Sequence, residues 1–216
     1  MKGSVESLDG LRRIENTNKH EMGGLMADIT HAVYPHDQVY GEYCPIQAHI
    51  NCPPEKVFEY MSNPLCLLEW TYSMRKFERL TEDGLFVGKD RIGDNTDIYF
   101  KVIANKEALI VDYHCAWDQG DDLWMIYLNR IIPAEVVLKK PGSVVFWQNC
   151  RHEYYDKNPY PEVSPKGRPW VGQFWDFFYA GHMVELENLK RILEYRHAHN
   201  LPIGPYVNEQ GNLLCL

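Results

Sequence analysis

His182 and Glu185 are the residues of this sequence whose types and spacing best suit proton chemistry. They stand three apart in a helical pattern that runs from about 171 to 199, and residues at that spacing share one face of a helix. At ~100° per residue, both fall on the apolar stripe of this pattern. A carboxyl and an imidazole on one buried stripe can act as an acid and base pair. The alternative is a buried hydrogen-bonded network without chemistry.

Arg151 is the third expected catalytic residue, contributed by a sheet that faces this helix. Turn patterns at 104–107, 118–121 and 140–143 separate successive strands, and turns of this kind fix which residues face inward. Carried through the last turn, the register directs Arg151 toward the helix. There it would pair with Glu185 or orient a carbonyl or carboxylate group of a ligand.

The same register predicts the residues that bind the substrate. It sets Tyr99 opposite Asp112 and places Ile126 and Leu128 on the inner face. Aromatic residues make up 13% of the chain, enough to wall an apolar pocket. The expected substrate-binding residues are Tyr113, Trp124, Trp147 and Asn149 from the sheet side and Phe178 from the helix.

A metal site is the alternative to this metal-free arrangement. Pro133 lies within an expected strand, where proline cannot donate to the ladder and often marks a bulge. A bulge there would turn His152 inward in place of Arg151. His152, His182 and Glu185 would then offer ligands for zinc or another divalent metal. We otherwise expect no cofactor, and His114 is expected to face solvent.

The surrounding elements predict an α+β fold. Ile46, Ala48 and Ile50 alternate with polar residues, which is typical of a half-buried strand. A helix is expected after Pro53, since proline is tolerated in the first helical turn. Several strands then follow one another without an intervening helix, which favours antiparallel hairpins.

The segment 46–70 resembles the opening of the SRPBCC or START-like superfamily (Bet v 1 type), which includes polyketide cyclases. Members usually have a strand, then a helix of the form P-x-x-V-[FW]-x-x-[LM]-[ST]-[DN]-P, then a tryptophan. Here the pattern runs from Pro54 to Pro64 and is followed by Trp70. The resemblance covers about 43–200. It implies a helix-grip fold, in which a curved antiparallel sheet wraps around a long C-terminal helix, with two short helices after the first strand.

The resemblance also implies a function. It suggests an enzyme of the polyketide cyclase or dehydratase type, with acid and base chemistry on an aromatic or polyketide-like substrate. Two alternatives remain: a non-catalytic carrier for a hydrophobic ligand, and a zinc-dependent hydrolase of the helix-grip group. All three require a cavity between sheet and helix.

Composition and charge limit the partners. The net charge of −8 argues against nucleic acid and anionic membranes, which attract clustered Lys and Arg. No apolar stretch approaches the ~20 residues that span a bilayer. Six cysteines without a CxxC pair indicate free thiols and a cytoplasmic location. The expected partner is a small hydrophobic or aromatic molecule, and a homodimer is compatible with the sequence.

Three segments are expected along the chain. A polar stretch at 1–40 forms an N-terminal extension or a lid, 41–204 form the ligand-binding domain, and 205–216 form a C-terminal tail.

Overall fold

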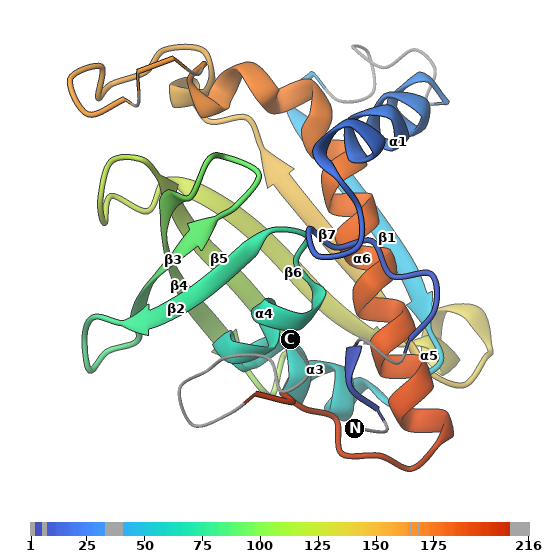
Figure 1. Cartoon of the computed structure of the whole chain (residues 1–216). Coiled ribbons are helices and arrows are strands. Elements are labelled where there is room, and N and C mark those ends of the chain that lie inside the picture. The colour runs from blue at the N-terminus through green and yellow to red at the C-terminus, as the bar shows by residue number, and fades with distance from the viewer. Residues whose placement is uncertain (1–2, 6–7, 33–40, 165, 168, 208–216) are drawn as a thin grey trace.

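Seven antiparallel strands form one sheet that curves around the long helix α6 (Trp175–Ala198) (Figure 1). The computed structural model describes residues 3–5, 8–32, 41–164, 166–167 and 169–207. The strand order is β1-β7-β6-β5-β4-β3-β2. The strands are β1 (Tyr43–Ile50), β2 (Met74–Arg79), β3 (Leu85–Asp90), β4 (Thr96–Asn105), β5 (Ile110–Trp117), β6 (Met125–Pro133) and β7 (Ser143–Cys150). This arrangement confirms the predicted helix-grip fold.

The helices lie where the opening motif predicts them. Two short helices, α3 (Pro54–Ser62) and α4 (Leu67–Trp70), follow β1, with the 3-10 turn η2 (Pro64–Cys66) between them. Asn63 ends α3 and caps η2, because its side chain accepts a hydrogen bond from Leu65 N at 3.0 Å. The other helical segments are α1 (Lys19–His31), α5 (Ala134–Leu138), η3 (Glu153–Tyr155) and η4 (Val171–Phe174). No helix in the described part of the chain is long and apolar enough to cross a membrane.

The predicted residue pairing between β4 and β5 is wrong, but each side chain lies on the predicted face of the sheet. Tyr99 pairs with Ala116 rather than Asp112, because the turn lies at 106–109, beyond the predicted 104–107. The change in register is an even number of residues, so each side chain keeps its face. Phe100 and Tyr113 are buried, as expected for the inner face.

The predicted inner face of β6 is also wrong. Tyr113 pairs with Tyr127, so odd-numbered residues of β6 face inward and Leu128 is 42% exposed. The link before β6 runs to Trp124, three residues beyond the expected four-residue turn. Ile126 and Leu128 therefore lie on the outer face.

A second error, in the predicted link between β6 and β7, cancels the effect of the first on the faces of β7. The link between β6 and β7 contains α5, which the sequence analysis treated as strand. Pro133 pairs with Ser143 at the end of β6 and precedes α5, and the β6–β7 ladder runs without a bulge. Val145, Trp147 and Asn149 consequently face inward, as predicted.

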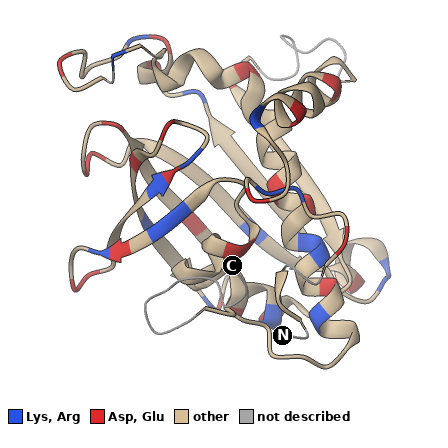
Figure 2. Ribbon diagram, viewed as in Figure 1, with Lys and Arg blue, Asp and Glu red and all other residues tan. Residues whose placement is uncertain are grey.

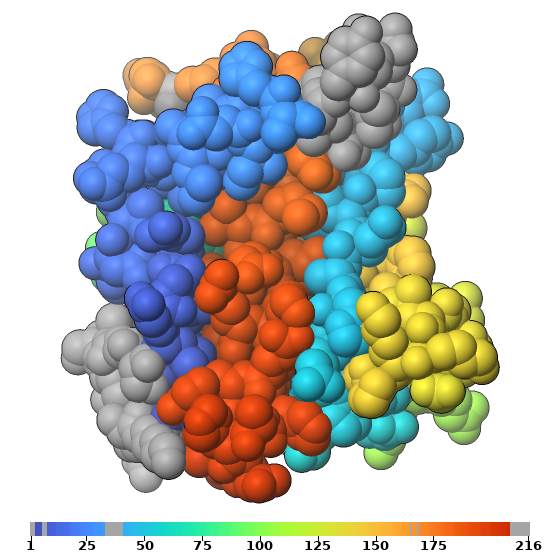
Figure 3. Space-filling model, turned by 90° about the vertical axis from the view of Figure 1, so that its right-hand side faces the viewer, coloured from blue at the N-terminus to red at the C-terminus, as the bar shows by residue number. Residues whose placement is uncertain are grey.

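The N-terminal segment is part of the packed fold. Helix α1 lies along the N-terminal part of α6, and the segment before it runs down the side of α6 (Figures 1 and 3). Met22 of α1 packs with Tyr72 and Val184. Asn188 of α6 accepts from Arg12 N at 3.1 Å and donates to Arg12 O at 2.9 Å and Trp70 O at 3.2 Å. Parts of the predicted 1–40 and 205–216 segments, namely 1–2, 6–7, 33–40 and 208–216, lie outside the described residues.

Replacing Asn188 with alanine should lower the free energy of unfolding by about 1–3 kcal/mol, because the buried Trp70 O and the partly buried backbone groups of Arg12 lose their partner. Urea unfolding followed by tryptophan fluorescence measures this loss. Asn51→Ala is the control, since Asn51 is exposed and donates through its backbone N–H. A loss below about 0.5 kcal/mol for Asn188→Ala would contradict the assigned role.

A fully buried ion pair joins both ends of the chain to the core. Arg196 of α6 and Glu69 of α4 form two hydrogen bonds at 2.8 and 2.7 Å, and both side chains are 0% exposed. The Tyr60 hydroxyl and Tyr206 N also donate to Glu69, at 2.7 and 2.9 Å. Arg196 Nε donates to Gly3 O at 3.1 Å. The remaining charged residues of α6 and the loops are interspersed in sign (Figure 2).

Candidate functional site

Glu185 projects from α6 toward the start of β2. Its Oε1 accepts a hydrogen bond from Tyr72 N at 2.9 Å, and the carboxyl has no other hydrogen-bond partner among the described residues. The side chain keeps intermediate accessibility although it lies between helix and sheet. One carboxyl oxygen is therefore held by the protein and the other is left for a ligand or water.

The surroundings of Glu185 favour its protonated form. Burial raises the pKa of Glu185 to about 7, and the hydrogen bond from Tyr72 N opposes this rise only in part. The charge of Asp90 raises the pKa further and that of Arg75 lowers it. A carboxyl with a pKa near 7 can both accept and release a proton at neutral pH.

His182 lies one turn before Glu185, enclosed by aromatic rings. Its ring stacks on Trp147 with centroids 4.8 Å apart and 29° between the planes. The rings of Tyr127 and Phe178 lie 5.2 and 5.3 Å away. Burial lowers the pKa of His182 to about 3, so the imidazole is neutral at physiological pH. Its buried Nδ1 has no hydrogen-bond partner among the described residues.

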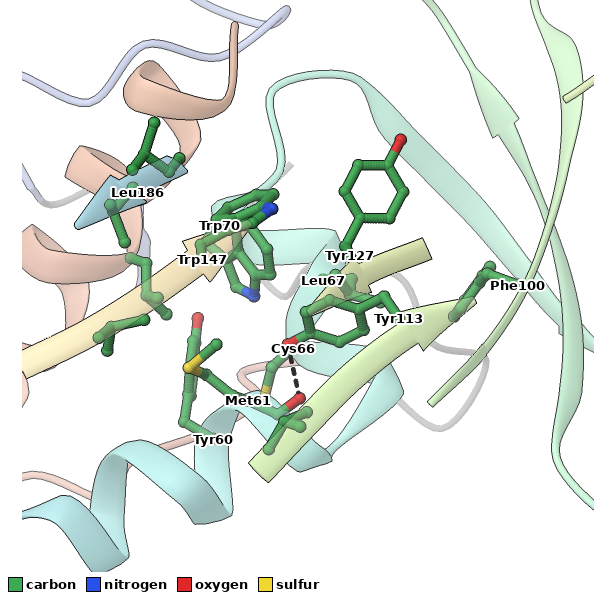
Figure 4. Packing of buried hydrophobic residues seen from close by; sticks show 14 of the residues in the cluster. Tyr60, Met61, Cys66, Leu67, Trp70, Phe100, Tyr113, Tyr127, Trp147 and Leu186 are labelled. Carbon is green, nitrogen blue, oxygen red and sulfur yellow. Dashed lines mark hydrogen bonds between the residues drawn. The ribbon is translucent and has the colours of Figure 1, made fainter. Parts of the chain in front are cut away.

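The predicted substrate-binding residues lie in three places. Trp147, Asn149 and Phe178 surround His182 or adjoin it, and Trp147 Nε1 donates to Asn149 Oδ1 at 3.0 Å. Tyr113 is tightly packed instead: its hydroxyl donates to Met61 O at 2.8 Å and its ring lies 6.0 Å from Trp70 (Figure 4).

Trp124 belongs to an aromatic cluster that adjoins the His182 group through Tyr155, whose ring lies 5.4 Å from that of Phe178. Its ring stacks with Trp170 at 6.0 Å and meets Tyr155 edge-on at 4.8 Å. The loop after β7 has no motif from which a role could be predicted. In the structure this loop brings Tyr155 and Trp170 onto the same cluster.

Arg151 lies near the first residue of α6 and does not reach Glu185, so its predicted pairing with Glu185 is wrong. β7 ends at Cys150, so the alternation of faces stops before Arg151. Its guanidinium is exposed, donates to Asp156 Oδ1 at 2.5 Å and lies 5.8 Å from the Trp175 ring. The backbone N–H of Arg151 donates to Glu42 O at 2.8 Å.

His152 is also outside the site that contains His182 and Glu185. It is exposed, its Nδ1 accepts from Tyr154 N at 3.2 Å, and its ring lies 4.4 Å from that of Tyr154. Among the described residues no three or more His, Cys, Asp or Glu side chains are grouped to hold a metal ion. The alternative set of His152, His182 and Glu185 therefore does not fit a metal.

Sequence reasoning missed Tyr127, which replaces Ile126 on the inner face. No hydrogen bond to its hydroxyl occurs among the described residues, and the hydroxyl points away from the residues packed around Tyr113 (Figure 4). Burial raises the pKa of Tyr127, and the charges of Tyr155 and Glu185 raise it further. Tyr127 is therefore a neutral donor near Glu185. Odd and even residues of β6 are similarly apolar, so the sequence carries no signal for this choice.

The sequence and the structure were compared with those of known proteins. No family model matches the sequence, and no curated protein matches it. Similar solved structures include the protein XoxI from Bacillus cereus, with 11% identity, coverage of 70% of this chain and 95% of that one, and a TM-score of 0.49. A START superfamily protein from Mycobacterium smegmatis has 14% identity, 74% and 99% coverage, and a TM-score of 0.45.

The di-domain ARO/CYC protein BexL of the BE-7585A biosynthetic pathway is a further match, with 12% identity and a TM-score of 0.49. The match covers 70% of this chain and 46% of that one. The likeness is one of fold. The activities that these names describe are those of the matched proteins. The helix-grip assignment rests on the strand order and the position of α6 in this chain.

Proposed function

We propose that the protein binds a small aromatic molecule between the sheet and α6 and moves a proton on it through Glu185. The observation that carries this proposal is the state of the Glu185 carboxyl. It is held at one oxygen by Tyr72 N, its second oxygen is unpartnered within the described chain, and its pKa is raised to about 7. Such a group is suited to general acid and base catalysis at neutral pH.

The side chains around Glu185 favour a neutral, aromatic ligand. Phe178, His182 and Glu185 keep intermediate accessibility between helix and sheet, which a binding space requires. The inward residues of β5, β6 and β7 have aliphatic, aromatic, thiol, thioether, hydroxyl or amide side chains, with no Lys, Arg, Asp or Glu among them. A charged ligand would lack a counter-ion on this wall.

The chemistry we propose is removal of a proton from a carbon next to a carbonyl. The Glu185 carboxylate takes the proton, and the electron pair of the C–H bond moves toward the carbonyl oxygen. The neutral Tyr127 phenol can donate a hydrogen bond to the oxygen that gains negative charge. In a cyclisation, the enolate carbon then bonds to a second carbonyl carbon of the substrate, and Glu185 returns its proton to the alkoxide that forms. In a dehydration, the C–O bond of a β-hydroxyl breaks, and the leaving group takes the proton from Glu185 and departs as water.

Glu185→Gln tests this proposal. With the two-ring aromatic ketone 2-tetralone as the probe in D2O, we expect the wild-type protein to accelerate exchange of the hydrogens next to the carbonyl. The variant should lose this acceleration by about 10²–10⁴-fold, while binding, followed by tryptophan quenching, changes less than about threefold. Glu187→Gln, on the exposed side of α6, is the control. Equal exchange by the wild type and Glu185→Gln sinks the proposal.

A non-catalytic binding protein is the second candidate. The neutral His182 ring, stacked on Trp147, favours it, because an aromatic cage of this kind binds a ligand without any proton transfer. Binding of 2-tetralone by both proteins, without exchange above the rate in buffer, would support this candidate.

A further inference from the structure

The backbone of Tyr72 contacts both Glu185 and the N-terminal segment. Tyr72 N donates to Glu185 Oε1 at 2.9 Å, while Tyr72 O accepts from Ile14 N at 3.2 Å. The Tyr72 hydroxyl donates to Thr17 O at 3.0 Å. The group that holds the Glu185 carboxyl is therefore itself held by residues 14 and 17.

The same segment neutralises a buried arginine beside the site. Glu15 accepts two hydrogen bonds from Arg75, at 2.7 and 2.9 Å, and the Arg75 side chain is 6% exposed. Arg13 and Arg91 lie 3.5 and 3.6 Å from Glu15. Because Arg75 is buried, its charge is poorly screened by solvent, and Glu15 is its counter-ion.

Several strands contribute the groups that face Glu185. β2 contributes Arg75, β3 contributes Asp90, β5 the neutral Cys115 thiol and β6 the neutral Tyr127 phenol. On α6 itself, His182 is uncharged. Of these groups Arg75 is the cation, so its pairing with Glu15 has direct consequences for the Glu185 charge.

We propose that residues 11–17 form a positioning strap for Glu185. The strap fixes the backbone of Tyr72, and its residue Glu15 offsets the charge of Arg75. The inference rests on the proposed function and adds how the protonation of Glu185 is controlled. With the strap in place, Glu185 can hold a proton near neutral pH. Loss of the Glu15 charge would leave Arg75 without its counter-ion and would favour the ionised Glu185 carboxylate, which cannot donate a proton.

Glu15→Gln tests the strap through the ionisation of Glu185. The protein is labelled with carbon-13 at the glutamate side-chain carboxyl, and the Glu185 signal is assigned by its loss in Glu185→Gln. Removal of a nearby anion should lower the pKa of Glu185 by roughly 0.5–1 unit. Glu187→Gln, which removes an exposed anion of the same helix, should leave the titration unchanged. A shift below about 0.2 unit in folded Glu15→Gln would overturn the proposal.

Tyr72→Phe is a second variant that keeps the ring packed on Met22 and Val184. Losing the hydroxyl bond to Thr17 O should speed hydrogen exchange at the Ile14 amide. Because it also loosens the Tyr72 N bond, which lowers the pKa of Glu185, it should raise that pKa while the Glu15–Arg75 pair stays intact. Faster exchange at Ile14 with an unchanged Glu185 titration would overturn the proposal. Both readouts are independent of turnover, so the strap and the proposed catalysis can fail separately.

Discussion

Replacing Glu69 with alanine is expected to lower the free energy of unfolding by about 3–5 kcal/mol, the loss typical when one partner of a buried ion pair is removed. Arg196 would keep its charge at 0% exposure but would lose its two hydrogen bonds to the Glu69 carboxylate. The Tyr60 hydroxyl and Tyr206 N would lose their acceptor as well. Urea unfolding at pH 7, followed by circular dichroism, measures the loss.

Two further variants separate the effect of the unpaired charge from the effect of the space left by the shortened side chain. Glu187→Ala breaks the Glu187–Arg191 pair, whose side chains are 48% and 45% exposed, and should cost about 0.5 kcal/mol or less. The double variant Glu69→Leu with Arg196→Met removes both buried charges and should recover more than half of the Glu69→Ala loss. A double variant as unstable as Glu69→Ala would contradict the account based on an unpaired charge.

The sequence predicted the fold well because its strongest signals are local. Pro54 begins α3, Asn63–Pro64 ends it, and the 3.6-residue period of α6 brings His182 and Glu185 to one buried side. These features depend on backbone restrictions and helix geometry, which act over a few residues.

The candidate site was harder to predict, because it depends on strand register. A change of one residue in β6 exchanges Ile126 for Tyr127 on the inner face. The predicted partner of Glu185 failed for a related reason: Arg151 follows the last residue of β7, and a face assignment has no meaning beyond the ladder. The actual partner, Tyr72 N, is a backbone group, which no side-chain pattern could indicate.

The buried ion pair shows a further limit of the sequence. Glu69 and Arg196 stand 127 residues apart, one in the opening motif at 46–70 and the other in the helical pattern at 171–199. A single charged residue on a buried stripe predicts that some partner exists, since unpaired buried charges are unfavourable. It does not say which segment supplies that partner.

His182 and Glu185 should give the stability of this protein opposite dependences on pH. The folded pKa of His182 is about 3 against an ordinary 6.5, so its contribution to stability is present above 6.5 and is lost as the pH falls. The folded pKa of Glu185 is about 7 against 4.5, so its contribution is present below 4.5 and is lost as the pH rises through 7. From pH 8 to pH 5 each effect amounts to about 2 kcal/mol.

The wild-type protein should therefore change little in stability between pH 8 and pH 5, because the two effects nearly cancel. His182→Phe keeps a ring against Trp147 and leaves only the Glu185 effect, so its free energy of unfolding should rise by about 2 kcal/mol toward pH 5. Glu185→Gln leaves only the His182 effect and should fall by a similar amount. Urea unfolding at several pH values measures all three slopes. Variants whose slopes match the wild type would show that both groups titrate normally, and the enclosed, low-dielectric surroundings assigned to them would be wrong.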